Sequence, residues 1–141
     1  MDLSAIVARL KAQLTGVKDV GVVADLVAAA TGMVATPSAF VLPLADSAVD
    51  IGMLSQTGEK IAQTFGVVHC INNRRDAKGG AALDDLKTLR LALRAALVGW
   101  VPDASNGEAV TFASGRLLQL DGDGRLWWQD EFELTTYYWS T

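Results

Sequence analysis

The sequence has one cysteine, Cys70, and one histidine, His69, in 141 residues. A single cysteine cannot form a disulfide within the chain, and the apolar run around Cys70 favours a role as a small hydrophobic residue. A lone histidine leaves a metal site without a second histidine ligand. Because the two residues are neighbours in an apparent strand, their side chains point to opposite faces and cannot act together as nucleophile and base. We therefore expect no metal, no cofactor and no catalytic residue, and we interpret His69 as structural.

The chain also lacks an excess of positive charge and any long apolar run. Twelve basic and sixteen acidic residues give a net charge of -4, so no strong general field attracts nucleic acid or an anionic membrane. The apolar stretches fall well short of the ~20 residues that span a bilayer, and the amphipathic N-terminal segment has no cleavage site. We expect a protein that is made in a cytosol and does not enter a membrane.

Two short motifs lack residues that their chemistry requires. Asp121 and Asp123 resemble the start of a calcium loop, but the later ligands and the terminal glutamate are missing. The sequence Lys78-Gly79-Gly80 lacks the GxxxxGK[ST] order that binds phosphates. One alternative is a small cytosolic enzyme or ligand-binding domain that uses His69 and Asp130, and it would need converging polar groups in a cleft.

What the sequence does contain is enough hydrophobic residues for one core. Half of the residues are hydrophobic, and at this length roughly two-thirds of the unfolded surface can be buried. There is no internal repeat or linker, so we expect a single domain over residues 1–141.

Two segments have the apolar periodicity of amphipathic helices. The first covers residues 2–15 and ends before Gly16. The second starts at Ala81 and ends near Gly99, because Pro102 prevents a long continuation. Its apolar stripe contains Leu83, Leu86, Leu89, Leu93, Ala96, Leu97 and Trp100.

The opposite side of the second helix has a thinner stripe. Leu91 and Val98 lie seven residues apart, flanked by Lys87 and Arg94. Such a stripe is either incidental or a subunit contact.

Other segments favour strands and one short helix. Residues 18–23 predict a short strand, residues 24–30 a short helix, and residues 38–44 a strand in which Pro43 indicates a sheet edge or strand end. Residues 60–72 are apolar on both alternating faces, which is typical of a central strand. Residues 46–58 have no clear period, and we expect a loop there that either folds over the core or contacts a partner through apolar residues such as Ile51 and Met53.

The C-terminal end predicts a β-hairpin, in which residues 110–120 and 126–139 are joined by the turn at residues 121–124. The last strand has two unlike faces. The face expected to lie on the core is interrupted by Asp130 and contains Leu126, Trp128, Phe132, Leu134 and Tyr138. The other face mixes acids with aromatics, which is unusual for a surface that only meets water, and contains Trp127, Gln129, Glu131, Glu133, Thr135, Tyr137 and Trp139.

The order of several segments resembles the tail terminator proteins of long-tailed bacteriophages. The resemblance runs from about Ala39 to Trp139, with agreement before it only in the opening helix. It is carried by Ala39-Phe40-Val41-Leu42-Pro43-Leu44, Thr64-Phe65-Gly66-Val67-Val68, Asn73-Arg74-Arg75-Asp76-Ala77-Lys78-Gly79-Gly80-Ala81-Ala82-Leu83, Gly115-Arg116-Leu117-Leu118 and Leu126-Trp127-Trp128-Gln129-Asp130-Glu131-Phe132.

The resemblance implies a structural virion protein and no enzymatic activity. It implies an α+β fold with a mixed, mostly antiparallel sheet, two main helices packed on it and a C-terminal β-hairpin. It further implies a homohexameric ring on the head-proximal end of the tail tube, assembled in the host cytoplasm. Its partners would be the tail tube protein and a head-completion or connector protein, and DNA would pass through without specific binding. Another phage head-tail adaptor or tail-completion protein is the main alternative.

A closed ring requires one patch of a subunit to meet a different patch of its neighbour. We hypothesise that the aromatic and acidic face with Trp127, Glu131, Tyr137 and Trp139 is one patch. The basic loop with Arg74, Arg75, Asp76 and Lys78 would be the other, because opposite charges can fix the register. Ile51 and Met53 are further candidate contacts.

Overall fold

The computed structural model describes residues 3–23, 36–72, 80–118 and 125–140. Within these ranges the elements follow the order α1 (Ser4–Gln13), β1 (Asp19–Val22), β2 (Ser38–Asp50), β3 (Thr57–Asn72), α3 (Gly80–Leu97), β4 (Thr111–Leu118) and β5 (Arg125–Ser140). The predicted helix at residues 24–30, the turn at 121–124 and the loop at 73–79 lie outside the described residues. Both main helices and all five predicted strand regions are confirmed.

The strands form one mixed sheet in the order β1-β2-β3-β5-β4. β1 runs parallel to β2, and the other neighbouring pairs are antiparallel. β3 lies at the centre, as its two apolar faces predicted. Together with the two helices, this sheet confirms the expected α+β fold.

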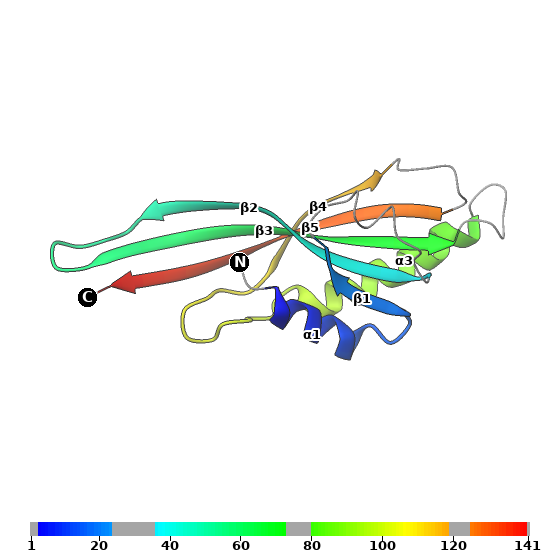
Figure 1. Cartoon of the computed structure of the whole chain (residues 1–141), viewed down its shortest axis with the longest axis horizontal. Helices are drawn as coiled ribbons and strands as arrows, with labels where there is room; N and C mark the ends of the chain where they lie inside the picture. The colour runs from blue at the N-terminus through cyan, green and yellow to red at the C-terminus, as the bar shows by residue number, and fades with distance from the viewer. Residues whose placement is uncertain (1–2, 24–35, 73–79, 119–124, 141) are drawn as a thin grey trace.

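Both helices pack on the same face of the sheet (Figure 1). The main core joins side chains from α1, α3 and the sheet, with Ile6, Leu93 and Phe132 among the fully buried residues. Phe132 stacks on Phe65 and meets Phe112 edge-on, each with ring centroids 5.6 Å apart. A further cluster joins Ala82, Leu86 and Leu89 of α3 to Ile71.

The opposite face of the sheet has its own apolar cluster, which contains Phe40, Leu42, Val68, Cys70 and Trp127. Cys70 is therefore a buried hydrophobic residue, as its setting predicted. Trp127 corrects an expectation, because its side chain is only 1% exposed. It pairs with Cys70 across β3 and β5, so the face that we expected to be a partner surface is apolar core at this end of the strand.

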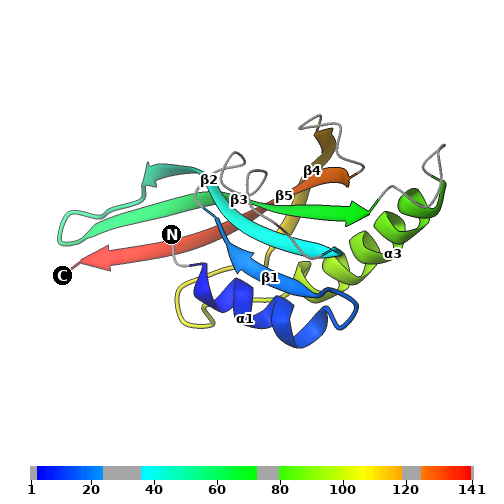
Figure 2. The same ribbon diagram turned by 45° about the vertical axis from the view of Figure 1, so that its right-hand side comes forward.

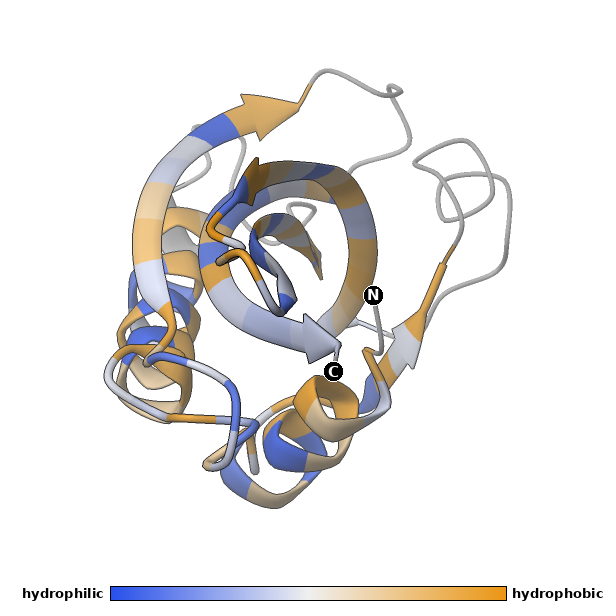
Figure 3. Cartoon of the chain, turned by 90° about the vertical axis from the view of Figure 1, so that its left-hand side faces the viewer, coloured by the Kyte–Doolittle hydropathy of each residue, from blue (hydrophilic) through white to orange (hydrophobic). Residues whose placement is uncertain are grey.

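Three strands continue well past the helices. Figures 1 and 2 show β2, β3 and β5 extending together to one side, and Figure 3 shows the strong twist of the sheet seen along this extension. We call residues 44–62 with residues 135–140 the arm, and the other described residues the body. The first five residues of β2 are buried and the last eight are exposed, so burial ends where the arm begins.

The arm replaces most of the loop expected at residues 46–58. β2 continues to Asp50 and β3 starts at Thr57, which leaves residues 51–56 as the connection. The alternation that identifies a half-buried strand is absent because residues 46–50 of β2 are all exposed. Pro43 lies where β2 has passed its last bond to the β1 segment and where the register with β3 shifts, which agrees with its predicted edge position.

Candidate functional site

The residues that the sequence suggested for subunit contacts lie in several places. Arg74, Arg75, Asp76 and Lys78 are outside the described residues. Glu131 belongs to the body, where its carboxylate accepts hydrogen bonds from Gln129 Nε2 at 2.8 Å and Ser114 Oγ at 3.3 Å. Trp139 lies near the end of the same strand, about 26 Å further along at the usual rise per residue. The structure therefore does not bring the aromatic and acidic residues of that predicted face together.

The arm holds four of the suggested residues. Met53 is 68% exposed in the connection between β2 and β3, and Ile51 is partly buried beside it. Tyr137 is partly buried and Trp139 is 45% exposed. The Trp139 ring lies directly over Gly58, its partner across β3 and β5, where a side chain on Gly58 would collide with the indole. The indole of Trp139 thus covers the backbone of β3 at Gly58, which has no side chain of its own to shield it.

One side of the arm is acidic. Asp46 and Asp50 of β2 share this side with Glu59 of β3, and all three are exposed. Asp50 and Glu59 are direct cross-strand partners, an arrangement of like charges that destabilises a sheet. Asp50 also accepts a hydrogen bond from the Gly52 amide at 2.8 Å. We call Asp46, Asp50 and Glu59 the acidic side of the arm; within the described ranges no basic side chain forms an ion pair with them.

Tyr138 corrects another expectation. The alternation of β5 placed it on the core face, but it is 51% exposed. It pairs with Glu59 across the arm, beyond the reach of the helices. The predicted face of β5 is correct, but the helices that cover this face in the body do not extend to Tyr138.

The second exposed surface is the outer face of α3. It consists of Leu83, Lys87, Leu91, Arg94 and Val98. These positions follow at intervals of four, four, three and four residues, which places them on one side of the helix. Leu91 is 60% exposed, as the thin second stripe predicted, but Leu83 was expected in the core and is exposed instead.

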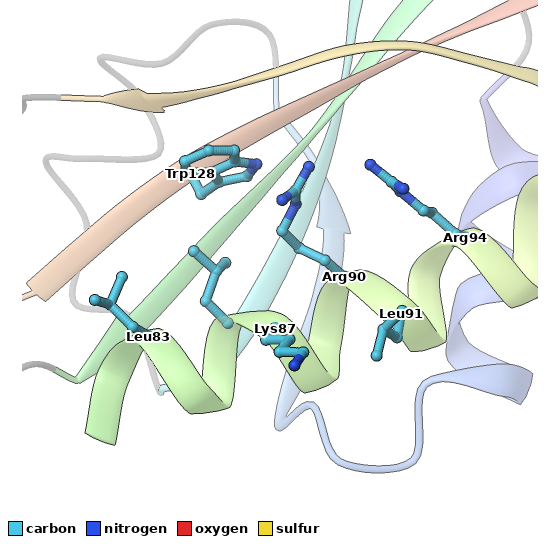
Figure 4. A pocket seen from close by; sticks show the side chains of 7 residues that line it. Leu83, Lys87, Arg90, Leu91, Arg94 and Trp128 are labelled. Atoms are coloured by element: carbon cyan, nitrogen blue, oxygen red, sulfur yellow. The ribbon is translucent and has the colours of Figure 1, made fainter. Parts of the chain in front are cut away.

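A groove of about 320 Å³ lies between this face and β5. It is lined by Leu83, Leu86, Lys87, Arg90, Leu91, Arg94 and Trp128. Figure 4 shows Arg90 and Arg94 directed from α3 toward the sheet, with Trp128 opposite Arg90. Leu83 is exposed because it borders this groove. The guanidinium of Arg90 lies 4.5 Å from the centre of the Trp128 ring, and that of Arg94 lies 4.1 Å from the Phe112 ring.

A buried polar network lies beneath the groove. Asp130 is completely buried and accepts hydrogen bonds from Arg90 Nη2 at 2.9 Å, Trp128 Nε1 at 3.0 Å and His69 Nε2 at 3.2 Å. Burial raises the pKa of Asp130, but the hydrogen bonds from His69, Arg90 and Trp128 outweigh it and lower the pKa to about 2. Asp130 is therefore an ionised carboxylate at neutral pH that ties α3 to β3 and β5.

His69 and Asp130, which the enzyme or ligand-binding alternative named together, do meet, although they come from different strands. Asp130 lies on β5, two residues beyond Trp128, which is the cross-strand partner of His69. His69 and Asp130 are both fully buried, so neither opens onto a cleft in which a substrate could meet them. Gly115 of β4 lies against the same network. A Cβ there would lie 2.6 Å from Asp130 Oδ1 and 2.8 Å from Arg90 Nη2, so a larger residue would disturb this ion pair.

The described residues also bear on metal binding and on membrane insertion. No group of three or more His, Cys, Asp or Glu side chains in these ranges is placed to hold a metal ion. None of the helices in these ranges has the length and apolar character needed to cross a membrane.

The fold and its exposed surfaces define a small α+β protein with exposed apolar groups gathered on a projecting arm and along one helix. Comparison with protein families gives the particular family: the chain belongs to the phage tail terminator proteins, whose family model matches residues 1–139. It is thus a structural protein of a phage tail and a virion component.

A solved structure supports the fold. The chain is similar to a chain in the "Virion of native gene transfer agent (GTA) particle", with a TM-score of 0.52 and 14% sequence identity over 97% of this chain and 87% of that one. No curated protein sequence matches.

Proposed function

We propose that this protein forms a ring on the head-proximal end of the phage tail tube, where it ends tube polymerisation and provides the joint to the head-completion proteins. Assembly takes place in the host cytoplasm. The ring consists of identical subunits, six in number by resemblance to other tail terminators. Neither part of this task requires a chemical reaction, and membership of a structural virion family supports a protein without enzymatic activity.

The observation that carries this proposal is the arm. Its strands are long and regularly paired, yet the arm presents exposed Val49 of β2 and exposed Met53 and Leu54 of the connection to solvent. Exposed apolar groups on a projecting element are typical of a surface that becomes buried against another protein. An arm of this kind fits a protein whose task is to bind copies of itself and neighbouring virion parts.

A ring also needs two different contact surfaces on each subunit. The arm and the outer face of α3 meet this requirement, because they extend to different parts of the molecule (Figures 1 and 2). The net charge of -4 supports a channel through which DNA passes without specific binding, since a basic lumen would hold phosphates.

The proposal is tested by polymerising the purified tail tube protein with and without this chain and measuring tube lengths by electron microscopy. We expect the chain to stop elongation and a gold label on it to mark one end of each tube. Tubes of unchanged length, or label along their whole length, would contradict the proposal. Label found on heads that lack tails, with bare tube ends, would indicate a head-tail adaptor instead.

A further inference from the structure

We infer that the arm of one subunit binds the outer face of α3 in the next, with the acidic side of the arm against Lys87 and Arg94. Met53 and Leu54 at the end of the arm would then lie against the apolar residues of that helix. This inference rests on the proposed ring, and it names the two surfaces that close it. The occupant of the helix surface is thus a second copy of this chain.

The charges of the two surfaces are complementary. Asp46, Asp50 and Glu59 form a stripe without a basic partner in the described parts of the chain. On α3, Arg90 is already paired with Asp130 at 2.9 Å, whereas Lys87 and Arg94 form no ion pair among the described residues, although the Arg94 guanidinium lies over the Phe112 ring. Two acids facing each other across a strand pair are unfavourable alone, and a neighbouring cation would relieve that repulsion.

The spacing of the charges also agrees. Asp46 and Asp50 are four residues apart on a strand, a separation of about 13 Å. Lys87 and Arg94 are seven residues apart on one side of a helix, a separation of about 10.5 Å. The two separations differ by about 2.5 Å, a difference that the long, flexible side chains of Lys87 and Arg94 can span.

Apolar groups accompany the charges on both surfaces. Leu83, Leu91 and Val98 alternate with the two basic residues along α3, and all three are exposed. On the arm, Met53 and Leu54 are the exposed apolar residues of the connection, and Leu54 has no cover at all. In the proposed contact the apolar residues of the arm and of α3 are buried against each other. Their removal from water stabilises the association beyond what the charges contribute.

Simpler pairings of these two surfaces are unfavourable. The arm extends away from the body, so it does not fold back onto its own α3 (Figure 1). An arm against an arm would bring acids together, and an α3 face against an α3 face would bring Lys87 and Arg94 together. Of these pairings between described surfaces, the arm with the helix of another copy is complementary in charge, and such a head-to-tail contact is the kind that closes a ring.

The test uses two charge-reversed variants of the full chain. The arm variant carries Asp50→Lys and Glu59→Lys, and the helix variant carries Lys87→Glu and Arg94→Glu. All four side chains are exposed, so both variants should fold, which circular dichroism verifies. Self-association is measured by native mass spectrometry and light scattering, on the free chain and on chain bound to the ends of tail tubes.

We expect each variant alone to self-associate about a hundredfold more weakly than the parent, because like charges then face each other at every contact. An equimolar mixture should regain association, since the basic arm of one variant then meets the acidic helix of the other. The recovered assemblies should contain the two variants in equal numbers, alternating around the ring.

Matched controls separate a specific contact from total charge. Asp19→Lys with Glu108→Lys makes the same charge change as the arm variant at exposed sites of the body. Lys11→Glu with Lys18→Glu does the same for the helix variant. Both controls should associate like the parent protein.

Three outcomes would overturn the inference. The first is a variant that associates like the parent, and the second is a mixture of folded variants that does not recover. The third is an arm variant that keeps its ring but loses the tube end, which would place the tube protein on the arm. In all three cases the proposed function is retained if the parent protein still shortens tubes. A parent protein that neither associates nor shortens tubes would refute the proposed function.

Discussion

The body and the arm share three strands, β2, β3 and β5, but differ in what covers these strands. In the body, β3 and β5 have an apolar core with two helices on one face and a second apolar cluster on the other. In the arm, the same strands keep their pairing to Thr57 and Ser140, but most of their side chains are exposed or only partly buried, and Thr136 is buried beside its bridge to Gly107. Pairing therefore extends strands further than burial does, and the exposed side chains of the arm are available to another protein.

The difference separates two kinds of residue. Side chains of the body determine whether the chain folds, because they are buried among many neighbours. Side chains at the end of the arm contribute little to folding and are available for assembly. Substitutions in the body should therefore lower stability. Substitutions at the end of the arm should weaken self-association and leave stability nearly unchanged.

The largest effect on folding should come from Phe132→Ala in the body. Phe132 is fully buried between Phe65 and Phe112, so its removal should lower the free energy of unfolding by about 3–5 kcal/mol. Urea unfolding followed by circular dichroism measures this loss. Trp139→Ala on the same strand is the matched change in the arm, and it should cost clearly less. Equal losses would mean that the arm is part of the folding core.

A smaller effect should follow acidification, through Asp130. Its pKa is about 2 in the folded protein and 3.8 ordinarily, so the unfolded chain binds this proton more readily as the pH falls. The contribution of the carboxylate is complete above about pH 4 and is lost as the pH falls toward 2, a change of about 2 kcal/mol. The measurement is urea unfolding of the parent and of Asp130→Asn between pH 6 and pH 2.

The parent should be the more stable of the two at pH 6, and the difference should shrink as the pH falls, because the amide that replaces the carboxylate does not titrate. Other carboxylates titrate in both proteins, so they cancel in the comparison. A difference that is independent of pH would show that Asp130 is not held ionised by His69, Arg90 and Trp128.

The smallest effect on folding should come from Met53→Ser with Leu54→Ser at the end of the arm. Both side chains are exposed, so the free energy of unfolding should change by less than about 0.5 kcal/mol. Self-association should nevertheless weaken, because the apolar groups of the proposed contact are gone. Light scattering measures it, with Val22→Ser, an exposed apolar position of the body, as the control. Unchanged association would mean that Met53 and Leu54 do not contribute to the contact and that the charges of the arm account for it.

Most of the body could be predicted from the sequence because its periodicities reflect burial. The helical stripes of α1 and α3 and the two apolar faces of β3 each correspond to a side that is covered in the structure. Predictions were wrong where the sequence pattern does not match the burial in the structure. Trp127 lies among acids and amides in the sequence but packs on Phe40 and Val68, and Leu83 continues an apolar stripe but borders an open groove.

The arm and the buried network could not be predicted from local patterns. Residues 46–50 have no strand alternation because all five are exposed, and their strand character comes from pairing with β3. Likewise His69, Arg90 and Asp130 are separated along the chain and meet only because α3 crosses the sheet beside β5. The basic loop at residues 73–79, which was the predicted partner of the aromatic face, stays a prediction.

By itself, the sequence determined the class of fold, the positions of the helices and central strand, and a resemblance that the family match confirmed. These follow from short-range periodicity and residue order, which a chain carries whether or not it is folded. Only the tertiary structure decided which aromatic residues stay exposed, which acid meets the lone histidine, and that three strands continue as an arm. Those properties depend on which distant segments lie next to one another, and no local pattern records that.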